Sequence, residues 1–335
     1  MNSVPAKSND IFADKFGRTH TYLRISVTDR CNLACVYCMP AEGFPWIPKE
    51  EVLSFEEIVR LVKVFARGGI TNIRLTGGEP TIRRDIVELV RQVASVEGIT
   101  DVAMTTNGLR LPKLAQELAD AGLTRVNISV DTLNQERFNS VSGGGRISDV
   151  LDGVDAARAA GLTPVKVNTV LLKGENDSEI RELVEKFEGH NGETELRFIE
   201  YMPFGERRCE GVVASDVRDI ISKFRTVVPT DYKRGGGPAV GYEILESGLK
   251  LGFISPLSEK FCEGCNRLRL MADGNLRTCL SDDGTPSLRD LIRGSITDED
   301  LFRAVQEMVM GKREGHGCTV EGGDVFEGVM TRIGG

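Results

Sequence analysis

The chain has 335 residues, of which 40% are hydrophobic, with eight cysteines and a formal net charge of −8. This length suits two domains or one large α/β domain with an appendage, and the negative charge disfavours a general nucleic-acid binder. No apolar run reaches the roughly 18 residues of a membrane span, and residues 1–17 lack the apolar segment of a signal peptide. We therefore expect a cytoplasmic protein with a flexible N-terminal leader over 1–17.

Strand-like and helix-like patterns alternate from about residue 20 to 225. Short segments rich in β-branched residues predict strands at 22–27, 72–77, 101–106, 125–130, 164–170 and 195–202. Apolar residues at helical spacing predict helices at 54–69, 85–98, 111–121, 147–160, 178–189 and 215–224. Repeated β-then-α units indicate a parallel sheet, either open and doubly wound or forming a partial barrel. In both cases the chemistry is expected beyond the carboxyl ends of the strands.

The pattern changes after about residue 230. A glycine-rich break at 233–238 precedes two expected hairpins, at 242–254 and 267–280, and a helical tail follows from about 287. We therefore divide the chain into the leader, a core over 18–230 and a smaller C-terminal α+β region over 231–335.

Three cysteines follow the first expected strand in the segment CNLACVYCMP. Cys31, Cys35 and Cys38 have the spacing C-x3-C-x2-C, and no fourth cysteine or histidine lies nearby. Structural zinc sites and most iron–sulfur clusters have four protein ligands. This group therefore indicates either a zinc loop that borrows a distant ligand or a four-iron cluster with one iron left open for a small molecule.

The C-x3-C-x-Y-C segment, together with Gly77-Gly78-Glu79-Pro80 after the second strand, resembles the radical S-adenosylmethionine superfamily. The resemblance implies a [4Fe-4S] cluster on Cys31, Cys35 and Cys38, whose open iron binds S-adenosylmethionine. Reductive cleavage of this cosubstrate yields a 5′-deoxyadenosyl radical. The resemblance further implies cosubstrate contacts at Tyr37, Gly78, Ser129 and Met202. Glycines at 77 and 78 would let the main chain approach the ligand closely.

A second group consists of Cys262, Cys265 and Cys279, spaced C-x2-C-x13-C. From spacing alone, a zinc site completed by Cys209 or Cys318 is an alternative. With Arg267 and Arg269 after the CxxC, the two groups resemble the GTP 3′,8-cyclases of molybdenum cofactor biosynthesis, over residues 14–335. In that family the open iron of a second [4Fe-4S] cluster binds the guanine ring.

This second resemblance implies an α/β fold: a partial (β/α)6 TIM-like barrel of parallel strands with the smaller C-terminal α+β region. It implies a lyase that converts GTP to 3′,8-cyclo-7,8-dihydroguanosine 5′-triphosphate. The implied partners are a reductant such as a flavodoxin or ferredoxin system, a downstream cyclic pyranopterin monophosphate synthase and a second copy of the chain in a homodimer. Neither a nucleic acid nor a membrane is expected as a partner.

Cationic residues within apolar strands are the candidate substrate ligands. The resemblance implies substrate contacts at Arg24, Arg74, Thr105, Lys166, Arg267 and Arg269. A charge inside an apolar strand costs free energy unless it is paired, so inward-pointing cations would indicate an anionic ligand, whereas outward-pointing ones would simply be solvated. The resemblance also implies a catalytic role for the C-terminal Gly334 and Gly335, which reach into the active site of the family.

Two other functions remain open from the sequence. A radical S-adenosylmethionine enzyme that modifies peptides would typically carry more cysteines in its C-terminal region. A zinc-stabilised binding protein would have no chemistry, and its metal would be colourless zinc instead of iron.

Overall fold

The computed structural model describes residues 11–40, 42–190, 192–204, 209–231, 237–282, 286–318 and 330–333. The strands are β1 (Tyr22–Ser26), β2 (Asn72–Thr76), β3 (Asp101–Thr106), β4 (Arg125–Ser129), β5 (Val165–Leu171), β6 (Thr194–Glu200), β7 (Val227–Pro229), β8 (Val240–Ile244), β9 (Lys250–Ile254), β10 (Arg267–Leu270) and β11 (Leu276–Arg277). The helices are α1 (Phe55–Arg67), α2 (Ile86–Ala94), α3 (Leu111–Asp120), α4 (Gln135–Ser142), α5 (Ile147–Ala159), α6 (Ile180–Glu188), α7 (Ala214–Ser222), α8 (Leu288–Arg293), α9 (Asp298–Met310) and α10 (Met330–Ile333).

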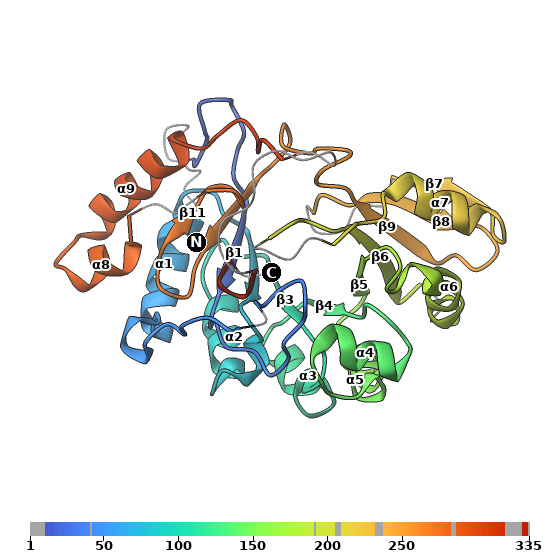
Figure 1. Ribbon diagram of the computed structural model, residues 1–335. Coiled ribbons are helices and arrows are strands. Elements are labelled where there is room, and N and C mark those ends of the chain that lie inside the picture. Colours follow the sequence, from blue (N-terminus) through green and yellow to red (C-terminus); the bar gives the residue numbers. More distant parts are fainter. Residues whose placement is uncertain are drawn as a thin grey trace.

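Strands β1 to β6 lie side by side in chain order and are all parallel. Among the described residues the sheet runs β11-β10-β1-β2-β3-β4-β5-β6-β9-β8-β7, so its two edges do not meet. The sheet curves, and helices α1 to α6 cover its outer side (Figure 1). The expected partial barrel is therefore confirmed. Helix α4 was not expected, because its sequence QERFNSVS is mostly polar and offers little helical periodicity.

Alternation along each strand separates the core from the barrel interior. On β1, Leu23 and Ile25 are fully buried in the hydrophobic core, whereas Tyr22 and Arg24 face the interior cavity. The core lies between the outer face of the sheet and the helices. Helix α1 begins as expected at a capping box, in which the Glu57 N–H donates to Ser54 Oγ at 3.2 Å.

The C-terminal region extends the same sheet at both edges. Both expected hairpins form, with β9 antiparallel to β8 and β11 antiparallel to β10. Strand β10 then pairs in parallel with β1, and β9 pairs in parallel with β6. Strand β7 pairs with β8 across the expected boundary at residue 230. The two regions therefore share one sheet.

The final part of the expected leader packs against the helices. Phe12 is fully buried, and its ring lies 5.8 Å from that of Phe65 on α1 and 5.0 Å from that of Phe302 on α9. Asp14 is also buried. Only the part of the leader before residue 11 lies outside the described residues. No helix in the described part of the chain combines the length and apolar character needed to cross a membrane.

Candidate active site

Both cysteine groups line one cavity of about 360 Å³. Cys31, Cys35 and Cys38 follow the carboxyl end of β1, whereas Cys262 and Cys265 precede the amino end of β10, which runs parallel to β1. The lining includes all six cysteines singled out in the sequence: Cys31, Cys35, Cys38, Cys262, Cys265 and Cys279. Cys318 instead lies buried in a small apolar cluster with Phe204, Met271 and Ile333. Cys209 does not line the cavity either. The cavity therefore brings together two groups that are separated by more than half of the chain.

The first cysteine group sits on the loop after β1 in an electronegative, buried environment. Burial raises the pKa of the Cys38 thiol to about 12, and the neighbouring Cys31 and Asp131 add to the effect. The Tyr37 hydroxyl donates to Asp131 Oδ2, which fixes the aromatic ring beside the thiols. Burial also raises the pKa of Asp131 to about 6. Cationic ligands that offset several thiolates would be favoured in this environment.

The donor set fits a cluster with one open iron. Three thiols line the cavity from the first loop, and no group of three or more His, Cys, Asp or Glu side chains in the described part of the chain is arranged around a single metal ion. Beyond the thiols, the cavity wall carries buried acceptor oxygens without hydrogen-bond partners among the described residues: Asn127 Oδ1, Asn168 Oδ1 and Glu200 Oε1. Buried polar atoms normally have partners, so these oxygens favour a polar ligand in the cavity.

The glycines after β2 are required by packing against the loop that follows β1. A Cβ at Gly77 would overlap the carbonyl oxygen of Thr28, and a Cβ at Gly78 would overlap that of Arg30. The sequence indicated a different reason, close approach to the ligand. The contacts of this structure show that the glycines also let the two loops pack closely together beside the cavity, and the close approach to the ligand stays a prediction.

Replacing Gly78 by alanine is expected to lower the free energy of unfolding by about 1–3 kcal/mol, because the added methyl group has no room. Iron content after anaerobic reconstitution should fall with it, since the displaced loop carries the cysteines. Gly189→Ala is the matched control, because a Cβ there meets no atom within 4 Å. Denaturant unfolding and an iron assay measure both effects. Equal stability of the two variants would contradict the packing role.

The second cysteine group lies in an electropositive environment. Burial raises the pKa of the Cys265 thiol, but the charges of Arg267 and Lys312 outweigh this effect and bring the pKa to about 7. Arg267 Nη2 lies 3.9 Å from Cys265 Sγ, and its guanidinium stacks over the Phe261 ring at 4.9 Å. The two cysteine groups therefore lie in opposite electrostatic surroundings.

Three arginines form a row across neighbouring strands. Arg24 on β1 is in register with Arg74 on β2 and Arg269 on β10, and adjacent strands lie about 4.8 Å apart. Burial and then the charge of Arg269 lower the pKa of Arg24 well below its usual value. Such a row of like charges favours an anion in the cavity. Arg74 Nη1 also donates to Thr105 Oγ1 at 3.3 Å, which brings a further expected substrate ligand to the same place.

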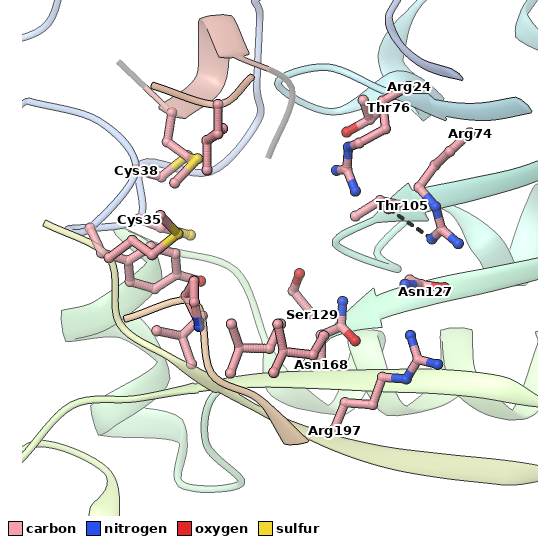
Figure 2. Close-up of a pocket in the computed structure, with 18 of the residues that line it drawn as sticks. Arg24, Cys35, Cys38, Arg74, Thr76, Thr105, Asn127, Ser129, Asn168 and Arg197 are labelled. Atoms are coloured by element: carbon pink, nitrogen blue, oxygen red, sulfur yellow. Dashed lines mark hydrogen bonds between the residues drawn. The ribbon is translucent and has the colours of Figure 1, made fainter. Parts of the chain in front are cut away.

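Arg197 on β6 is a cavity residue that the sequence analysis missed. It lines the cavity, and Arg24, Arg74 and Arg197 lie on the side away from Cys35 and Cys38 (Figure 2). Its Nε donates to Glu195 Oε1 at 2.5 Å. The same period-two alternation that singles out Arg24 also applies to ELRFIE, and it would have predicted an inward arginine there.

Lys166 is buried and is not one of the residues that line the cavity. Only 1% of it is exposed, and its Nζ lies 3.8 Å from Glu195 Oε2. Outward solvation is therefore excluded for Lys166. Burial, followed by the charge of Arg197, lowers its pKa to about 7. The other expected contacts that line the cavity are Tyr37, Gly78, Ser129, Met202, Thr105, Arg267 and Arg269.

Replacing Lys166 by methionine is expected to stabilise the protein by about 1–2 kcal/mol at pH 6, because a buried ammonium is replaced by an apolar chain of similar length. The folded pKa of about 7 lies below the unfolded value. In the wild-type protein the buried lysine therefore loses its proton as the pH rises above 7, which removes the free-energy cost of the buried charge. The difference in free energy of unfolding between variant and wild type then shrinks toward pH 9. Urea unfolding at pH 6, 7.5 and 9 measures this difference, and a constant difference would contradict it.

Gly334 and Gly335 lie outside the described residues. The carbonyl oxygen of Ile333, just before them, accepts a hydrogen bond from Arg269 Nη1 at 3.3 Å. Ile333 is buried, and Met330 lines the cavity. The described end of the chain is therefore held against the cavity wall.

Known proteins are similar to this chain in sequence and in fold. The family model of the Radical SAM superfamily matches residues 25–187, and that of Molybdenum Cofactor Synthesis C matches residues 194–318. The solved structure of SuiB from Streptococcus suis is similar with a TM-score of 0.62 at 16% identity, covering 88% of this chain and 67% of that chain. At this identity the likeness shows the fold alone. Fold and first cysteine group together define a radical S-adenosylmethionine protein.

Closer relatives narrow the class. The GTP 3′,8-cyclase of Marinobacter nauticus is 44% identical, with 96% of this chain and 98% of the relative aligned. The GTP 3′,8-cyclase of Lactiplantibacillus plantarum is 45% identical over 87% and 88% of the two chains. The chain belongs to the GTP 3′,8-cyclase family.

Proposed function

We propose that this chain closes a bond between carbon 3′ of the ribose and carbon 8 of guanine in GTP, which gives 3′,8-cyclo-7,8-dihydroguanosine 5′-triphosphate. The observation that carries the proposal is a single cavity with the thiols of Cys31, Cys35 and Cys38 on one side and a row of arginines on the other. A radical source and a polyanion can meet in such a cavity. The name of the relatives supports GTP as the substrate.

Cys31, Cys35 and Cys38 would hold a [4Fe-4S] cluster, and Tyr37, Gly78, Ser129 and Met202 would contact S-adenosylmethionine at its open iron. When bound, this pair supplies a 5′-deoxyadenosyl radical able to remove a hydrogen atom from carbon 3′. The protein positions the reactants: the hydrogen bond from Tyr37 to Asp131 holds the ring beside the thiols, and the buried acceptors Asn127 and Asn168 offer hydrogen bonds to polar ligand groups.

The triphosphate would be bound by five arginines: Arg24, Arg74, Arg197, Arg267 and Arg269. Thr105 would be a neutral donor, and the buried Lys166 would add positive charge. Arginine suits phosphate because its planar fork can donate two parallel hydrogen bonds. The protein is acidic overall, so local charge has to attract the nucleotide. The alignment of three arginines on adjacent strands supplies that local charge.

Cys262, Cys265 and Cys279 would hold a second [4Fe-4S] cluster whose open iron faces the guanine ring. The support is their shared cavity and the cations next to Cys265. Gly334 and Gly335 would complete the site from the C-terminus, which Arg269 holds through Ile333. We also propose a cytoplasmic protein that receives electrons from a flavodoxin or ferredoxin system, passes its product to cyclic pyranopterin monophosphate synthase and works as a homodimer, on the strength of the family resemblance.

The test is anaerobic turnover of the reconstituted protein with GTP deuterated at carbon 3′. One deuterium is expected in the released 5′-deoxyadenosine, and the product should retain the triphosphate. ATP deuterated at the same carbon is the control and should transfer none. Release of 5′-deoxyadenosine without deuterium would refute the proposed hydrogen abstraction, and a colourless protein with stoichiometric zinc would refute the enzyme altogether.

A further inference from the structure

Lys312 is a buried lysine that contacts the second cysteine group. It follows α9 and is only 2% exposed. Its Nζ lies 2.8 Å from the carbonyl oxygen of Arg267, 2.9 Å from His20 Nε2 and 3.6 Å from Cys265 Sγ. The Cys265 carbonyl oxygen lies at 3.5 Å. The carbonyl oxygens accept hydrogen bonds, and the imidazole nitrogen and the sulfur can do so, which suits an ammonium with three donors.

His20 fixes the direction of this ammonium. Its Nδ1 lies 3.2 Å from the carbonyl oxygen of Phe12, and since a carbonyl only accepts, Nδ1 carries the ring proton. Nε2 is then an acceptor for Lys312. Burial and then the charge of Lys312 lower the pKa of His20 to about 4, so the ring stays neutral near pH 7. Lys312 is thus the donor in this contact.

The charge of Lys312 is matched by thiolates and not by carboxylates. No Asp or Glu in the described part of the chain forms an ion pair with it, and Asp14 lies beyond His20, 3.7 Å from Nε2. A buried ammonium is costly unless a negative charge is near. The Cys265 sulfur lies 3.6 Å from Nζ, and Cys279 lines the same cavity. The thiolates of the second group are therefore its counter-charge.

The N-terminal segment fixes the backbone around this contact. Arg18 donates to the carbonyl oxygens of Cys262, at 2.9 Å, and Glu314, at 2.6 Å. It thereby ties the CxxC loop to the segment that carries Lys312. The ammonium is held next to Cys265 by partners from both ends of the chain.

We infer that Lys312 is a positioning residue for the second cluster: it donates a hydrogen bond to the Cys265 thiolate and makes that cluster easier to reduce. The inference rests on the second [4Fe-4S] cluster of the proposed function. Hydrogen bonds to sulfur and nearby positive charge favour the more negative, reduced state of an iron–sulfur cluster. In the part of the chain that the structure describes, the sulfur of Cys31 accepts a hydrogen bond from the Leu33 N–H, and no lysine or arginine side chain donates to a thiol of the first group.

The test isolates the second cluster. Full-length protein with Cys31, Cys35 and Cys38 replaced by alanine is reconstituted anaerobically, its iron is counted, and its one-electron reduction is titrated by electron paramagnetic resonance. Lys312→Met is expected to lower the equilibrium constant for reduction about tenfold, which is about 59 mV. Lys312→Arg keeps the charge and should stay close to the parent. Lys173→Met is the control, because Lys173 pairs with Glu210 at the surface and does not line the cavity, and it should leave the titration unchanged.

Each outcome decides the inference. Full iron with an unchanged titration in Lys312→Met would overturn it, as would an equal shift in Lys173→Met. If Lys312→Met loses iron, Lys312→Gln retains a donor for the Arg267 carbonyl and replaces it in the titration. Iron loss in both neutral variants with retention in Lys312→Arg supports the inference, and loss in all three overturns it. Absence of any cluster when Lys312 is intact would instead refute the second cluster itself.

Discussion

Cys31→Ala will abolish 5′-deoxyadenosine formation, whereas Cys262→Ala will retain part of this activity and lose cyclisation. The reason is that the two cysteine groups, which line one cavity, have different roles. The first group would hold the cluster at which S-adenosylmethionine is cleaved, and the second would hold only the base of the nucleotide. Losing a ligand from the first group removes the radical, while losing one from the second leaves a radical without a correctly positioned target.

Chromatography of anaerobic reactions measures 5′-deoxyadenosine and cyclised product together. Cys209→Ala is the matched control, because Cys209 does not line the cavity, and it should retain both activities. Cyclisation at the normal rate by Cys262→Ala would remove the second group from the site. Formation of 5′-deoxyadenosine by Cys31→Ala would remove the first.

Arg24→Met will weaken GTP binding about 10- to 100-fold and at the same time stabilise the protein without ligand. Arg24 is the middle member of the arginine row, in register with Arg74 and Arg269. A charge-assisted hydrogen bond contributes about 1.5–3 kcal/mol, and each 1.4 kcal/mol is a factor of ten in affinity. Without the anion, the same guanidinium is repelled by its neighbours, so methionine relieves the repulsion.

Equilibrium binding of GTP at two salt concentrations and thermal unfolding without nucleotide measure the two effects. The variant should show a smaller salt dependence of affinity, because one ionic contact is gone. Arg146→Met is the control, since the Arg146 side chain is 73% exposed and, in the described part of the chain, forms its ion pair with Asp149. Unchanged GTP affinity in Arg24→Met would remove this residue from the substrate site, and a lower melting temperature would contradict the repulsion.

Local patterns in the sequence predicted most of the barrel. The capping box at Ser54 correctly located the start of helix α1, because it depends on residues close in the chain. The sequence left open whether Arg24 and Arg74 point inward or outward, and the structure places both in the cavity lining. Arg197 escaped notice although its strand follows the same alternation. Helix α4 lacks an apolar stripe strong enough to be recognised, and it is stabilised by burial of Phe138 and Val141.

Features that depend on tertiary packing were beyond the sequence. Spacing did not predict that the CxxC of Cys262 lies on the same cavity as Cys31, because their meeting depends on the pairing of β10 with β1. The contact of Lys312 with His20 and Cys265 joins three distant segments and has no local signature. Nor did any local pattern show that Lys166 would be buried beside Glu195, and its contact with the substrate stays a prediction. The Gly78 requirement comes from the Arg30 backbone, which no motif reveals.

The placement of β9 and β10 has a consequence for how the chain can be divided and made. These two strands cover the unpaired sides of β6 and β1, so a fragment ending near residue 230 would expose two open strand edges. Open edges recruit other chains and promote aggregation. During synthesis, β1 cannot pair with β10 until most of the polypeptide has been made. Pairing between strands so distant in the chain slows folding. We expect truncated forms to precipitate, because only the intact polypeptide pairs the outer sides of β1 and β6.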